Sequence, residues 1–258
     1  MLDKDLHISW QENMEPSTLD SMIEVDELHP WYKARMVLIN EVIGTNISLD
    51  AKVLDFGCGS GAVLEMLKNK GLVNIRGADV SESCVTLAKS RGLEVNLIKP
   101  GYSELVKRKY DLILLLDVLE HIENDLEVLS ILRSSLSDNG RILITVPAHN
   151  FLWRSHDDAN HHYRRYSRKS LVKLIADSDC TIIHLRWWNS IMFLGFLFIS
   201  IRDKLSKRFF KDTSKKEDNF DLPSKFISKV ILRILSIESK SELLGKCMGV
   251  SLIALIKK

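Results

Sequence analysis

The sequence predicts an α/β protein built around a doubly wound parallel sheet. From about residue 53 to residue 147, short apolar segments alternate with segments of helical periodicity, as strand–helix–strand units require. Residues 110–116 are apolar apart from Asp111, which fits a central parallel strand that is covered on both faces. Residues 53–61 pass from an apolar strand through closely spaced glycines into a helix, the start of a nucleotide-binding βαβ unit.

The remaining elements follow from apolar patterning and from capping and turn residues. Ser81 is placed to cap a helix over residues 81–91, and Gly92 ends it. The fourth strand is expected to end at residues 117–122, and a helix with residues 120 and 121 on its first turn follows to about residue 136, before a turn at residues 138–140. Further strands are predicted at residues 74–79, 95–98, 141–147 and 181–185, and further helices at residues 167–177 and 224–237.

The composition limits the kinds of protein that the chain can be. Its 258 residues, 45% of them hydrophobic, suffice for one substantial α/β domain with an appendage. The net charge of +2 does not favour a nucleic-acid partner. Residues 1–11 have no signal-peptide core, and no apolar run reaches the roughly 20 residues that span a bilayer. The four scattered cysteines fit reduced thiols, so we expect a cytoplasmic protein.

The glycine loop differs in spacing from the loop of dinucleotide-binding folds. Gly57, Gly59 and Gly61 follow Asp55 in a G-x-G-x-G pattern, whereas a dinucleotide site reads G-x-G-x-x-G. An acid at this strand end would repel a pyrophosphate but suits a ligand that carries an ammonium group. Cys58 lies inside the same loop, where a disulfide would distort the ligand site. An NAD-dependent oxidoreductase is therefore disfavoured.

Acidic residues also end the second and fourth predicted strands. Asp79, which is followed by Val80, can accept hydrogen bonds from both hydroxyls of a ribose, although an acid there can also cap a helix. Asp117 ends the fourth strand. Because the carboxyl ends of parallel strands line one crevice, we expect Asp55, Asp79 and Asp117 to surround the same ligand.

Residues 27–35 form a further cluster of polar and aromatic side chains just before the first strand. They include a carboxylate, an imidazole, two aromatic rings and the guanidinium of Arg35. Arg35 is placed to pair with a carboxylate of the ligand. Trp31 either covers that ligand or packs on the sheet.

The residues after the fourth strand carry a candidate general base. Glu120 and His121 can face the crevice beside Asp117, and His121 is predicted as a base. Two alternatives stay open. Glu120 and His121 can cap the following helix, or they can bind a divalent cation together with Asp117 and a ligand from His149 or Asn150.

A dense polar block occupies residues 153–166, after the fifth strand. We predict His156 as the base for an acceptor hydroxyl, with Asp157 raising the basicity of His156 or of His162. The arginines of the block suit a phosphate or a carboxylate on the acceptor. The predicted acceptor-binding residues are His162, Arg164, Arg165 and Tyr166. A structural zinc is disfavoured because the block lacks cysteine partners and histidines at helical spacing, so no metal is assigned.

Taken together, these motifs resemble those of class I S-adenosylmethionine (SAM)-dependent methyltransferases. The resemblance implies a Rossmann-like seven-stranded sheet, with a final antiparallel strand beside the fifth and a helical insertion before it. It implies a helical cap over residues 1–50, a SAM-binding core over 51–189, the insertion over 190–248 and the last strand over 249–258. It also implies SAM as the cofactor, held by Arg35, Asp55, Gly57, Cys58, Gly59, Gly61, Asp79, Val80 and Asp117.

The resemblance leaves the acceptor open. Residues 155–157 and 162–166 resemble a bacterial group often associated with surface polysaccharide and lipid-linked sugar pathways, which implies a sugar hydroxyl on a phosphate-bearing or lipid-linked glycan. Residues 117–121 are similar to quinone O-methyltransferases, in which a related run binds a divalent cation; this implies a quinone or small lipid acceptor. A non-catalytic SAM-binding partner in a membrane-associated complex is a third interpretation. Nucleic-acid methylation is disfavoured, because no aromatic–proline tetrad follows the fourth strand.

An unusually apolar stretch precedes a basic one in the last third of the chain. Residues 187–201 are rich in aromatic and aliphatic side chains, and five basic residues follow between positions 202 and 211. This pattern is typical of a helix that lies in a membrane interface. A buried helix or a dimer interface would give the same pattern, so a peripheral membrane contact is one of three alternatives.

Overall fold

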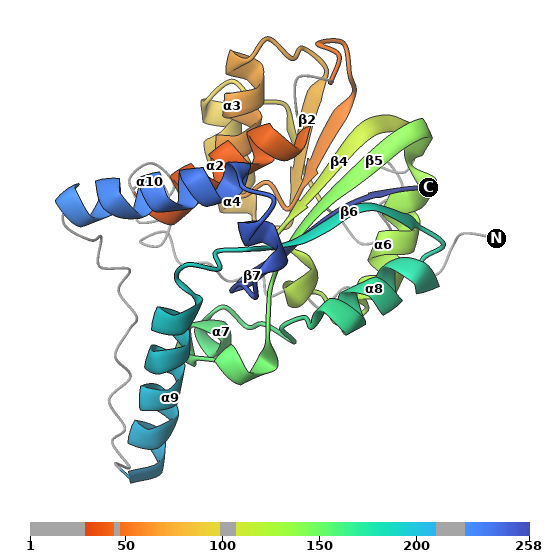
Figure 1. The fold of residues 1–258 in the computed structure, drawn as a ribbon. Helices are drawn as coiled ribbons and strands as arrows, with labels where there is room; N and C mark the ends of the chain where they lie inside the picture. The colour runs from red at the N-terminus through yellow and green to blue at the C-terminus, as the bar shows by residue number, and fades with distance from the viewer. Residues whose placement is uncertain (1–28, 44–46, 99–106, 210–224) are drawn as a thin grey trace.

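A seven-stranded sheet with helices on both faces forms the body of the protein (Figure 1). The computed structural model describes residues 29–43, 47–98, 107–209 and 225–258. The strand order is β3-β2-β1-β4-β5-β7-β6. The strands are β1 (Val53–Phe56), β2 (Ile75–Asp79), β3 (Val95–Leu97), β4 (Tyr110–Leu116), β5 (Leu136–Pro147), β6 (Thr181–Trp188) and β7 (Ser251–Lys257).

The first five strands run parallel, and the last strand runs against them. Pairings β1–β2, β1–β4, β2–β3 and β4–β5 are parallel, whereas β7 pairs antiparallel with both β5 and β6. The predicted fold class and the antiparallel last strand beside the fifth are therefore confirmed.

The helices divide the core into two layers. On one face of the sheet, α6 (Asp125–Ser134) and α8 (Arg168–Asp177) supply leucine, isoleucine and valine side chains. The other face is covered by α2 (Pro30–Ile43), α3 (Ala62–Asn69), α4 (Glu82–Ser90) and α10 (Lys225–Lys240). Successive residues of β4 alternate between the two layers, as the period of a strand requires.

Two local predictions are wrong. Residues 120 and 121 are not on the first turn of the following helix: the chain forms the short η1 (Leu119–His121), becomes extended at the fully buried Ile122, and then enters α6. The turn predicted at residues 138–140 lies inside β5. A Cβ on Gly140 would lie 2.7 Å from the carbonyl oxygen of Tyr110, so glycine here permits close pairing of β5 with β4 across a register shift.

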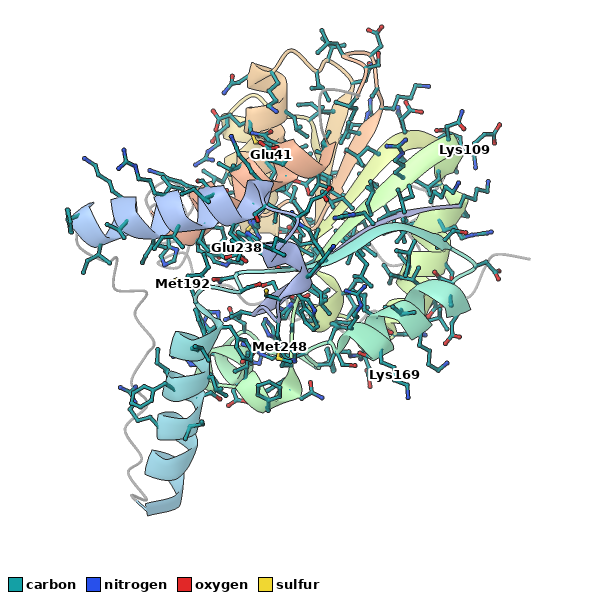
Figure 2. All side chains as sticks on the ribbon, viewed as in Figure 1. Glu41, Lys109, Lys169, Met192, Glu238 and Met248 are labelled. Atoms are coloured by element: carbon teal, nitrogen blue, oxygen red, sulfur yellow. The ribbon has the colours of Figure 1, made fainter. Side chains whose placement is uncertain are left out.

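The predicted helical insertion lies between β6 and β7. It consists of α9 (Phe193–Phe209) and α10, and α10 lies across α2 whereas α9 projects from the body (Figure 1). Glu238 of α10, labelled in Figure 2, is buried and accepts hydrogen bonds from the backbone N–H groups of Ser190 and Ile191, just before α9. Among the described residues, no helix has both the length and the apolar character needed to cross a bilayer.

Candidate active site

The glycine loop joins β1 to α3 with three residues in left-handed conformations. Gly57, Gly59 and Gly61 have φ of 79°, 53° and 84°. A Cβ on Gly57 would lie 2.6 Å from a Val118 methyl group, and one on Gly61 would lie 2.5 Å from Leu93. Nothing lies within 4 Å of a Cβ placed on Gly59. Packing thus requires glycine at the two ends of the loop, while its centre is open for a ligand to approach the backbone.

Asp79 connects the glycine loop to the end of β2. One carboxylate oxygen accepts a hydrogen bond from the Gly59 N–H at 2.8 Å, and the other accepts from the Ser81 N–H at 2.9 Å. Burial raises the pKa of Asp79, and the two backbone hydrogen bonds oppose that rise. Each oxygen keeps a further lone pair, so the carboxylate can still accept two ligand hydroxyls. Val80, next in the chain, is half-buried.

Asp55 ends β1 as a buried acid beside this loop. Burial raises its pKa to about 7; Arg35 opposes the rise and Asp79 adds to it. The carboxyl is therefore close to half-protonated at neutral pH. A cationic group bound beside it would favour the ionised form.

Arg35 of α2 reaches across to the end of β4. Its Nη1 donates to a carboxylate oxygen of Asp117 at 2.7 Å, and its guanidinium lies 5.0 Å and 4.8 Å from the rings of Trp31 and Tyr32. Asp117 has φ of 57° and also accepts a hydrogen bond from the hydroxyl of Thr145 at 3.2 Å. Two residues predicted to contact the cofactor, Arg35 and Asp117, thus contact each other.

Cys58 is a packing residue of the loop rather than a reactive thiol. It is buried, and its sulfur would lie 2.7 Å from a Cβ on Gly77 of β2. Burial, reinforced by Asp55 and Asp79, raises the pKa of the thiol. The described cysteines form no disulfide, as the sequence predicts.

Asp157 and His162 form a hydrogen-bonded pair in the block after β5. An oxygen of the fully buried Asp157 lies 2.9 Å from Nδ1 of His162. The side chain of Arg165 donates to both carboxylate oxygens, at 2.7 Å and 2.9 Å. Burial opposes ionisation of Asp157, but the hydrogen bonds from His162 and Arg165 outweigh it and hold the pKa well below its usual range. An ionised Asp157 therefore orients the His162 ring.

His156, predicted as the base, lies next to Asp157 in the chain. It lies in α7 (Ser155–Ala159), where both ring nitrogens are 3.1 Å from Nδ2 of Asn160. The ring centre of His156 lies 6.5 Å from that of His162, so His156 borders the same group of side chains. Of the two histidines offered as partners of Asp157, the structure pairs the acid with His162.

His162 also lies beside the residues that follow β4. Its ring centre is 4.5 Å from that of His121, and the two rings are nearly perpendicular. Burial, followed by the nearby His162, lowers the pKa of His121 to about 4. Burial, followed by the nearby Asp117, raises the pKa of Glu120. A half-buried imidazole with a lowered pKa and a buried acid with a raised pKa are thus neighbours in the chain.

Glu120, His121 and His162 are arranged to hold a cation. Each offers one donor atom, and the three atoms lie within 4.8 Å of one another. Oxygen Oε2 of Glu120 is buried and has no hydrogen-bond partner among the described residues. An orphaned buried oxygen and two imidazoles fit a divalent cation with nitrogen and oxygen ligands.

Glu120 and His121 were predicted as ligands of such a cation, but together with Asp117 and either His149 or Asn150 rather than with His162. Asp117 is paired with Arg35, and His149 stacks on Trp187 with ring centres 4.8 Å apart. Asn150 accepts a hydrogen bond from the backbone N–H of Arg165. His162 lies 41 residues beyond His121, so no local spacing could have indicated it.

Three predicted acceptor-binding residues have structural partners instead. Arg165 is buried on Asp157, and Arg164 pairs with Asp125 at 2.8 Å and with the carbonyl of Glu123 at 2.6 Å. The buried Tyr166 donates to Asp125 at 2.6 Å. Side chains that satisfy buried carboxylates and loop carbonyls are not available for a phosphate, so the expected phosphate site is not supported.

Comparison with known proteins places the chain in a family. Residues 32–185 match the model of the family described as "Methyltransferase domain", which is more than half of the chain. The chain belongs to the class I SAM-dependent methyltransferase family. The glycine loop and Asp79 lie within the matched residues, and SAM is the cofactor that the family assignment supports.

Relatives and solved structures are consistent with this assignment. The methyltransferase is 31% identical over 125 residues to a ubiquinone biosynthesis O-methyltransferase of Rickettsia felis, covering 46% of this chain and 51% of the relative. Thus the match spans about half the length of that relative. It is 21% identical over 205 residues to the enzyme of the same name from Leptothrix cholodnii, covering 68% and 87% of the two chains. A SAM-dependent methyltransferase structure from Archaeoglobus fulgidus shares the fold, with a TM-score of 0.58, 18% identity and coverage of 92% and 99%.

Proposed function

We propose that this methyltransferase transfers the methyl group of SAM to a hydroxyl of a quinone-type small lipid. The observation that carries the proposal is the Asp157–His162 pair beside Glu120 and His121, close to the end of β4. The relatives in Rickettsia felis and Leptothrix cholodnii, both called ubiquinone biosynthesis O-methyltransferases, support a hydroxyl on a quinone precursor.

The cofactor residues bind and orient rather than react. SAM, when bound, supplies a methyl group already activated on a sulfonium, so alignment and a base are the main requirements of the protein. Asp79 would accept the ribose hydroxyls while its backbone bonds hold it against the glycine loop. Asp55 would pair with the ammonium group.

His162 is the base of the proposed reaction. With Nδ1 bonded to Asp157, its Nε2 is the nitrogen left to take the proton of the acceptor hydroxyl. As that oxygen bonds to the methyl carbon, the carbon–sulfur bond breaks and the electron pair stays on sulfur. Asp157 stabilises the imidazolium that results, and Arg165 keeps Asp157 ionised.

A divalent cation gives a second version of the same site. Glu120, His121 and His162 would hold it, and a bound cation lowers the pKa of a coordinated hydroxyl. His162 would then be a ligand and not the base. Divalent-metal dependence of the purified protein separates the two versions, because chelation abolishes transfer only when the cation is required.

The glycan acceptor rests on sequence resemblance alone. The arginines expected to bind its phosphate are engaged with Asp157 and Asp125, and none of the relatives reported above is named for a sugar acceptor. It remains the competing outcome of the experiment.

The test is methyl transfer from labelled SAM by the purified protein. Catechol-type quinone precursors with a short prenyl chain are compared with lipid-linked sugars, and each is assayed with and without a chelator. Label in the quinone precursor is expected. Label in the sugar only would replace the proposed acceptor, and no label with SAM binding intact would favour a non-catalytic SAM-binding protein.

A further inference from the structure

Helix α9 leaves a row of large apolar side chains in solvent. Leu194, Phe198 and Ile201 are 72%, 70% and 49% exposed, and their spacing of four and three residues puts them on one face. A scattered apolar side chain on a surface is ordinary, but a row along one helix face marks a contact with something else.

The opposite side of α9 is fixed to the body of the protein. Ser200 is buried and donates to the carbonyl of Phe151 at 3.0 Å. The ring of Phe193 lies 5.6 Å from His149, and the guanidinium of Arg154 lies 6.0 Å from the ring of Phe196. These contacts hold the helix on the segment that carries α7, so its exposed face has a defined orientation (Figure 1).

Basic residues accompany this apolar face. The sequence of α9 contains four basic residues and one acidic residue, and α10 contains four and one. The whole chain has a net charge of only +2, so positive charge is concentrated in these two helices. Arg202, Lys229 and Arg233 are exposed among the described residues.

We propose that α9 is an interfacial helix that docks on an anionic phospholipid surface. Its apolar face would enter the boundary between headgroups and acyl chains, while the basic residues meet the lipid phosphates. A second copy of the chain suits this face less well, because a two-fold contact would bring each basic helix against itself. On α10, Phe226 and Ile237 are also exposed, at 76% and 66%.

Docking through α9 would bring the lipid surface close to the candidate active site. The helix packs on the residues directly before His156 and Asp157, so the lipid surface would lie on the acceptor side of the protein. A lipophilic acceptor could then reach the site without crossing water. The docking does not depend on the proposed reaction, since it rests on the exposed side chains of α9 and α10.

The experiment measures co-sedimentation of the full-length protein with vesicles. Vesicles of phosphatidylglycerol and phosphatidylcholine are compared with pure phosphatidylcholine, at low and at high salt. Binding to the anionic vesicles, weakened by salt, is expected. L194S/F198S should lower the partition coefficient at least about tenfold. R202Q/K229Q/R233Q should reduce binding to anionic vesicles only.

Val73→Ser is the matched control, since Val73 is also 72% exposed but lies outside α9 and α10. It should bind vesicles as the parent does, and unchanged melting temperatures show that the variants fold. Vesicle binding that survives L194S/F198S, or no binding to any vesicle, overturns the proposal. If the parent is a dimer and L194S/F198S is a monomer, α9 is a contact between copies instead. Because no methyl transfer is measured, failure here leaves the proposed function untouched.

Discussion

The cofactor side and the acceptor side of the crevice are built in different ways. On the cofactor side, the loop from Asp55 to Gly61 and Asp79 lie within 25 residues, and backbone N–H groups make most of the contacts. On the proposed acceptor side, His121 follows β4 whereas Asp157 and His162 lie in the block after β5, and the rings of His121 and His162 are in contact. A site formed by backbone conformations can be predicted from local sequence patterns. A site formed by side chains that are distant in the sequence depends on the complete fold.

Replacing His162 should produce the largest effect. We expect His162→Ala to lower turnover about 10²- to 10⁴-fold, the range for loss of a general base, with little change in SAM affinity. His156→Ala is the comparison variant, because it removes the neighbouring imidazole and leaves the hydrogen bond between Asp157 and His162 in place. Steady-state kinetics of both variants measure the difference. If His156→Ala costs as much turnover as His162→Ala, the pairing seen on the acceptor side does not define the base.

Replacing Asp79 should affect binding and not chemistry. Asp79→Ala removes a carboxylate that holds the glycine loop and is predicted to accept both ribose hydroxyls, so SAM should bind on the order of 100-fold more weakly. Titration calorimetry measures this change. Asp138→Ala, at an exposed position of β5, should bind SAM like the parent. Equal affinities for Asp79→Ala and the parent would refute the ribose assignment.

Alanine substitutions of Gly57 and Gly59 should distinguish a glycine required for packing from one required for ligand contact. Both have positive φ, so alanine strains either one by about 1–2 kcal/mol. Gly57→Ala should lose about 1–3 kcal/mol more of the free energy of unfolding, because its Cβ would meet Val118. Gly59→Ala should instead weaken SAM binding. Denaturant unfolding and SAM titration of both variants measure this contrast, and equal losses of stability would contradict it.

The smallest predicted effect is a pH dependence of SAM binding. The Asp55 carboxyl has a pKa raised to about 7 by burial, and it must lose its proton to pair with a cation. SAM affinity should therefore fall as pH is lowered through 7, by at most about tenfold per pH unit. Calorimetry in two buffers of different ionisation enthalpy should detect proton release on binding. Asp55→Asn should bind weakly and without this dependence; an unchanged slope in that variant would assign the proton elsewhere.

In the absence of SAM, the Asp55 carboxyl makes the stability of the folded state depend on pH in the opposite direction: stability falls, rather than rises, as the pH increases. The folded state keeps the Asp55 proton at pH values where the unfolded chain, in which an aspartate has its ordinary pKa of 3.8, has lost it. The burial of Asp55 therefore costs stability progressively as pH rises from about 4 to about 7, and the full cost remains above that.

The sequence predicted most of the sheet, because strand and helix periods and the G-x-G-x-G spacing are local signals. It misjudged the turn at residues 138–140, since a D-N-G turn signal was overridden by close pairing of Gly140 with Tyr110. It also predicted that Arg164 and Arg165 bind a phosphate of the acceptor. Their true partners, Asp125 and Asp157, have no distinguishing spacing, and only burial reveals that the charges are already compensated.

The position of β7 in the sheet determines the order in which the strands can pair. This strand lies between β5 and β6, yet it is the last strand of the chain, and Leu252, Ile253, Ala254 and Ile256 are fully buried there. During synthesis, β5 and β6 would leave the ribosome before β7. The edges of both strands that later pair with β7 would then be unpaired. The sheet closes only after residues 251–257 emerge, so the nascent protein stays open to wrong strand pairing, or to chaperone capture, until then.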